Sequence, residues 1–158
     1  MRGVVAHVTM PANRAVPNVL FHLLRSRFRF NTMADQLARQ DAERPASYLI
    51  AALRSERLQA WRPPGGGAEG ALVHAVVHGL DVTVALDIGR RLPPERMRVV
   101  LDNLTARRSL AHFGIDISGM EPRADDLDWS RGSGTMVRAD AETLVLALSG
   151  RRPLPQPG

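Results

Sequence analysis

Two histidines four residues apart, His74 and His78, lie in the most apolar segment of the chain. Residues with this spacing share one face of an α-helix, so both imidazoles can bind a single metal ion. At about 100° per residue, Asp81 lies about 20° from His74 on the same face. Asp81 can accept a hydrogen bond from the outer nitrogen of a ligating histidine, or act as a weak extra ligand. The same three residues would also make a hydrogen-bonded polar stripe without metal.

A third histidine, His7, lies in the apolar stretch 4–8, where burial of an unpaired imidazole would be costly. We expect it to be the third ligand, although a satisfied core histidine is also consistent with this setting. Three histidines from two helices, with a position left to water, are typical of a catalytic metal site. Zinc fits best, while nickel, cobalt, manganese and iron also bind imidazole. We expect His22 and His112 to lie on the surface, because neither has a comparable setting.

Hydrophobic periodicity predicts the elements that would position these residues. Helices are predicted over residues 17–30, 45–60, 71–86, 94–112 and 140–148. Before the first of these, a short apolar stretch over residues 3–9 precedes Pro11, which would end or kink a helix. Prolines and glycines over 63–67 predict a flexible break, and residues 89–94 a linker.

The pattern changes after Gly114, where short strands are predicted at 128–130 and 135–137 around a turn at 131–134. Asp140 can cap the last helix and Gly150 can end it. We expect a helical domain over residues 1–90, a small α/β domain over 94–152 and a loose tail over 153–158.

Composition excludes several classes of site and of protein. The chain has 158 residues, 44% of them hydrophobic, and no cysteine, which excludes disulfides, thiolate-bound metals and cysteine nucleophiles. No apolar run reaches the length of a membrane span, and no signal-peptide pattern is present. We therefore expect a cytoplasmic protein with no membrane partner.

The net charge of +5 raises the possibility of a nucleic-acid partner. All 21 basic residues are arginine, as a GC-rich genome would produce, and they are spread along the chain without a nucleic-acid motif. We expect no nucleic-acid partner. An arginine-rich nucleic-acid binder is the competing hypothesis, and it would bind DNA in a strongly salt-dependent way.

Several motifs, in order along the chain, resemble the mycothiol-dependent maleylpyruvate isomerase family, whose metal-binding domain is similar to the DinB-like helical bundle. The residues that carry the resemblance are Val4-Val5-Ala6-His7-Val8-Thr9, Val77-His78-Gly79-Leu80-Asp81, Leu92-Pro93-Pro94-Glu95, Asp126-Leu127-Asp128-Trp129-Ser130 with Gly132 and Gly134, and Leu148-Ser149-Gly150-Arg151. The resemblance extends from residue 2 to about residue 152.

The resemblance implies a mainly α chain, with a DinB-like four-helix bundle followed by a small α/β domain. It implies a divalent metal held by His7 from an early helix and by His78 from a later one. His74 replaces the glutamate of the isomerases, which is closer to the three-histidine pattern of other DinB-like proteins. Family members also carry a helix ahead of the segment that begins at Met1, so the first helix of the bundle is expected to be missing or truncated. Either the start of the chain is placed too far downstream, which we favour, or a partner chain, such as a second copy in a homodimer, covers the exposed face.

The resemblance also implies a role for arginine near the metal. Arg151 matches a recurrent family position and is the candidate to hold a substrate carboxylate, with Arg138 as the second choice. A solvated arginine at a helix end is the alternative. The expected function is metal-dependent activation of a low-molecular-weight thiol, mycothiol, for isomerisation of, or transfer to, an electrophilic small molecule. The alternative is a non-catalytic metal-binding or partner-binding module derived from the same family.

Overall fold

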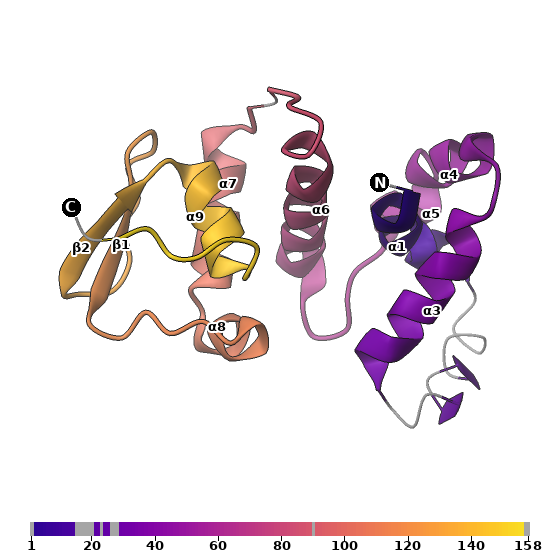
Figure 1. Ribbon diagram of the computed structural model, residues 1–158, viewed down its shortest axis with the longest axis horizontal. Coiled ribbons are helices and arrows are strands. Elements are labelled where there is room, and N and C mark those ends of the chain that lie inside the picture. The colour runs from indigo at the N-terminus through magenta and orange to yellow at the C-terminus, as the bar shows by residue number, and fades with distance from the viewer. Residues whose placement is uncertain (1, 15–20, 23, 26–28, 90, 157–158) are drawn as a thin grey trace. The chain divides into compact units, whose positions relative to one another are not determined.

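The structure is a computed structural model that describes residues 2–14, 21–22, 24–25, 29–89 and 91–156. These residues are mainly helical, with eight helices and one small two-stranded sheet, which confirms the predicted mainly α class. The chain forms two compact units, Met1–Arg62 and Pro63–Gly158 (Figure 1). No described helix has the length and apolar character needed to cross a membrane.

The first unit is built around α1 (Arg2–Asn13), which packs against α3 (Phe30–Ala42), α4 (Ala46–Leu53) and α5 (Glu56–Ala60). Its core consists of small and flexible apolar side chains, among them Ala6, Met10, Met33, Leu37 and Leu49.

Helix α1 continues through Pro11, so this proline does not end the helix. A proline inside a helix costs about 3 kcal/mol. Burial of Ala6, Thr9 and Met10 between α1 and its neighbours offsets that cost.

The remaining helices of this unit differ from the prediction in two places. The periodicity did not predict α3, and the helix predicted over 17–30 lies largely outside the described residues. The single helix predicted over 45–60 is divided into α4 and α5. Ser55 begins α5, where its hydroxyl accepts a hydrogen bond from the amide of Leu58 at 3.3 Å.

The second unit contains α6 (Gly67–Thr83), α7 (Pro94–Leu104), α8 (Arg107–Phe113) and α9 (Ala141–Leu148). Helices α6, α7 and α9 pack on one another around a continuous apolar core (Figure 1). Helix α6, which carries two of the candidate ligands, therefore packs with the C-terminal elements, whereas the sequence predicted it within a domain over 1–90. The family-type domain organisation stays a prediction.

The helix predicted over 94–112 also ends early. Thr105 caps the end of α7, and its hydroxyl donates to the carbonyl of Leu101 at 2.8 Å. By contrast, the predicted start of α9 is confirmed, because Asp140 accepts from the amide of Thr143 at 2.7 Å. Gly150 follows that helix with a φ of +73°, as expected for a C-terminal cap.

The sheet consists of two parallel strands, β1 (Met120–Ala124) and β2 (Thr135–Ala139), in which Arg123 lies opposite Arg138. The expected strand at 128–130 is wrong. This segment forms no strand and makes one isolated bridge, between Ser130 and Arg123. The sequence did not predict β1, because its charged residues and Pro122 interrupt the alternating apolar pattern typical of a strand. Gly134 permits the close pairing, because a Cβ there would lie 2.1 Å from the carbonyl oxygen of Gly119.

The core of the second unit gives a direct test of this packing. Leu144 is fully buried on α9, so Leu144→Ala should lower the free energy of unfolding by about 2–5 kcal/mol. Leu86→Ala is the matched control, because Leu86 is half-exposed and should cost less than about 0.5 kcal/mol. Urea unfolding in a Trp61→Phe background, followed by the fluorescence of Trp129, reports on this unit. Equal losses for the two variants would contradict the assigned core.

Candidate metal centre

Helix α6 brings His74 and His78 together on one face. The core face of this helix carries Val76, Val77 and Leu80, which are buried, while both histidines are half-buried. Their ring centroids lie 4.6 Å apart, with the rings at 71° to one another. The predicted four-residue pair is therefore confirmed as a close imidazole pair on a helix.

Asp81, one turn after His78, fixes the second ring. The Nδ1 atom of His78 and the Oδ2 atom of Asp81 lie 2.9 Å apart, and the two side chains are only 19% and 21% exposed. An ionised carboxylate can only accept a hydrogen bond, so Nδ1 must carry the proton. The lone pair of the neutral ring then lies on Nε2, which is the tautomer of a metal ligand supported by a carboxylate.

Arg151 holds the same carboxylate from a distant part of the sequence. Its Nε donates to Oδ1 of Asp81 at 3.0 Å, and a terminal nitrogen donates to Oδ2 at 3.1 Å. The other terminal nitrogen donates to the carbonyl of Ser149 at 2.8 Å. This bidentate geometry is the strongest form of an arginine–carboxylate pair. It connects the end of α9 to the last turns of α6.

The electrostatics of the site keep Asp81 charged. Burial alone would raise the pKa of Asp81, but the hydrogen bonds and charge of Arg151, and then those of His78, outweigh it. The pKa of this carboxyl therefore lies below its usual value of 3.8. At neutral pH, Asp81 is an ionised acceptor between two donors.

The other residues predicted from the sequence have different settings. His7 is half-buried on α1 in the first unit, and its role as third ligand stays a prediction. Arg138 lies on β2 and pairs with Asp125 at 2.7 Å. His112 is exposed, as predicted, and its ring contacts Phe113. His22 is half-buried, with its ring 5.6 Å from that of Phe21.

Sequence reasoning missed what Arg151 does in the fold. It was the candidate to bind a substrate carboxylate, yet the carboxylate of Asp81 occupies its bidentate edge. Binding of a substrate would have to use its remaining donors, and that role stays a prediction. No local pattern could have revealed the pair, because its members are 70 residues apart.

No family model, curated protein or solved structure matches the chain. What the site can do follows from its own side chains: two adjacent imidazoles, a carboxylate that fixes one of them, and a guanidinium that fixes the carboxylate.

The tautomer of His78 can be tested directly. In the wild-type protein at neutral pH, long-range proton–nitrogen NMR should show the proton of His78 on Nδ1, because Asp81 accepts from that atom. Asp81→Ala removes the acceptor and should shift the proton towards Nε2. Asp87→Asn is the control, since Asp87 is an exposed carboxylate just beyond α6. A wild-type ring already protonated on Nε2 would contradict the assignment.

Proposed function

We propose that the protein is a metal-dependent enzyme in which His7, His74 and His78 hold one divalent cation, zinc in the first instance. The observation that carries the proposal is the contact of His78 with Asp81 beside a second imidazole on α6. A carboxylate behind a ligating histidine sets both its tautomer and its ring orientation. A polar stripe that only faces solvent would not require Asp81 to be held by a bidentate contact with Arg151.

His7 completes the proposed ligand set. Like His74 and His78 it is half-buried, and in the proposed site the three imidazoles would hold one ion. Three imidazoles leave a coordination position for water or a substrate atom, as catalytic zinc sites do.

The proposed chemistry is activation of a thiol. A divalent ion in this ligand set would stabilise a bound thiolate at neutral pH and so make a nucleophile. The chain has no cysteine, so the thiol must come from a small molecule, for which the family resemblance suggests mycothiol. The thiolate adds to an electrophile such as maleylpyruvate, and then leaves after isomerisation or remains in a conjugate. The DinB-like four-helix bundle is the structural part of the same proposal.

Within this proposal, Arg151 is a positioning residue. It keeps Asp81 in place and ionised, and Asp81 in turn orients His78. Loss of such an outer partner typically costs 10–100-fold in metal affinity.

Metal binding tests the ligand set. The purified full-length protein should contain about one divalent ion per chain, and His7→Ala, His74→Ala and His78→Ala should each lower the affinity for zinc strongly. Arg151→Gln should lower it by about 10–100-fold, whereas Arg152→Gln, its exposed neighbour, should not. Zinc titration against a competing chelator measures these affinities.

His112→Ala is the control for the histidine variants, because His112 lies exposed on α8. An unchanged affinity in His7→Ala would remove His7 from the site, and an unchanged affinity in all three histidine variants would remove the site altogether.

Turnover separates the enzyme from a binding module. The metal-loaded protein should convert maleylpyruvate, or add a thiol to a generic electrophile, only when mycothiol or another small thiol is present. The rate should fall to background in His78→Ala, and also in the wild-type protein when a chelator removes the metal. A stoichiometric metal without turnover on any thiol would instead identify a non-catalytic metal-binding module.

A further inference from the structure

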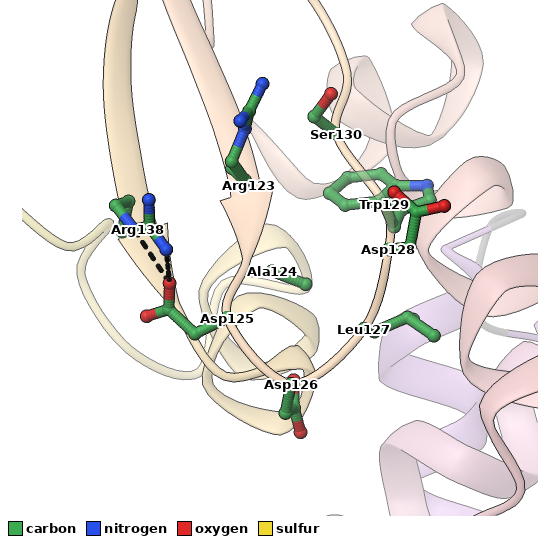
Figure 2. Close-up of a pocket in the computed structure, with 9 residues that line it drawn as sticks. All are labelled: Arg123, Ala124, Asp125, Asp126, Leu127, Asp128, Trp129, Ser130 and Arg138. Atoms are coloured by element: carbon green, nitrogen blue, oxygen red, sulfur yellow. Dashed lines mark hydrogen bonds and ion pairs between the residues drawn. The ribbon is translucent and has the colours of Figure 1, made fainter.

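Several pockets of the second unit are lined by arginine. Two of these pockets differ in how the charge of the arginine is balanced. The first has a volume of about 460 Å³ and lies against β1 and β2 (Figure 2). Its guanidinium groups already contact carboxylates, at 2.7 Å for Arg138 with Asp125 and 3.0 Å for Arg123 with Glu121. Figure 2 shows Arg138 turned towards Asp125. Because both guanidinium groups are paired with carboxylates of the protein, this pocket offers no unpaired arginine to bind an anion.

The second pocket has a volume of about 430 Å³ and lies between the glycine-rich loop before α6 and helix α8. Its wall includes Gly65, Glu69, Asn103, Arg108, Ser109 and His112. A guanidinium, an amide, a hydroxyl and an imidazole therefore converge on a space large enough for a small metabolite.

Arg108 differs from the arginines of the first pocket. Its exposed side chain makes no hydrogen bond or ion pair with any residue in the part of the chain that the structure describes. An arginine that lines a polar pocket without pairing to a carboxylate retains a donor edge suited to a planar or tetrahedral oxyanion.

The loop is shaped to accommodate this guanidinium. A Cβ on Gly65 would lie 3.2 and 3.3 Å from the two terminal nitrogens of Arg108, closer than most side chains tolerate. Gly65 also has a φ of +73°, which favours glycine for the backbone alone. The backbone conformation therefore favours glycine here, and a Cβ would require the end of the Arg108 side chain to shift by a few tenths of an ångström.

We propose that this pocket binds a small molecule that carries an oxyanion, either phosphate or carboxylate, together with a hydrogen-bond donor such as an ammonium group. Arg108 would bind the oxyanion, with Ser109 and Asn103 as further donors. Glu69, in the same wall, would repel a bare anion and accept from the ammonium group instead. The site is distinct from the proposed metal centre, because neither candidate ligand of α6 lines it.

Isothermal titration of the full-length protein tests the proposal with three probes: phosphoethanolamine, β-alanine and inorganic phosphate. Phosphoethanolamine or β-alanine should bind more tightly than inorganic phosphate, and the better of the two shows whether phosphate or carboxylate is preferred. Arg108→Gln should weaken that binding by at least about tenfold. Arg107→Gln, the exposed neighbour outside the pocket, should leave it unchanged.

Two further variants distinguish a loss of binding contacts from a loss of folding. Glu69→Gln should reduce the preference for the ammonium-bearing probe over inorganic phosphate, which a merely unfolded protein could not show selectively. Gly65→Ala should weaken binding, because it strains a backbone with positive φ and requires the guanidinium to shift by a few tenths of an ångström. The proposal is overturned if no probe binds saturably up to about 10 mM, or if Arg107→Gln and Arg108→Gln weaken binding equally. Neither result depends on metal content, so the proposed enzyme could stand while this site fails.

Discussion

The carboxylate of Asp81 is the constraint on which the described part of the site depends. It accepts from His78 on its own helix and from Arg151 beyond α9, so one ionised group connects the last turns of α6 to the end of the chain's last helix. Taking a carboxylate partly out of water is unfavourable unless its lone pairs are used. Here the bidentate guanidinium offsets that penalty and still leaves Oδ2 for the imidazole. The consequence is a histidine whose protonation and orientation are set before any ligand arrives.

Much of this arrangement is local and could be predicted from the sequence. Four-residue spacing in an apolar segment was sufficient to place His74 and His78 on one helical face, and three further residues placed Asp81 beside them. The cap at Asp140 and the glycine after α9 follow from equally short patterns. Each of these predictions uses only the geometry of one helix, which hydrogen bonds within a few residues determine.

The features that the sequence did not reveal depend on contacts between distant segments. Arg151 and Asp81 are 70 residues apart, so no spacing rule connects them. The parallel pairing of β1 with β2 requires Gly134 to approach Gly119 closely, and this contact between separate segments is not visible in the local sequence. The continuation of α1 through Pro11 depends on what α3 and α4 bury against it. The breaks at Ser55 and Thr105 come from side chains that hydrogen-bond to the backbone, a signal that apolar periodicity does not contain.

Helix α6 carries both proposed functions, and its geometry keeps them apart. With a rise of about 1.5 Å per residue, His74 lies about 10 Å along the axis from Gly67, and Asp81 about 20 Å. The start of the helix is the positive end of its dipole, where an oxyanion is favoured, and this preference fades within the first turn. The imidazoles lie beyond that range, and the orientation of His78 is set by Asp81 and Arg151 rather than by the helix start. A ligand in the pocket of Arg108 could influence the histidines only by shifting α6 as a body, and the packing of α6 against α7 and α9 opposes such a shift.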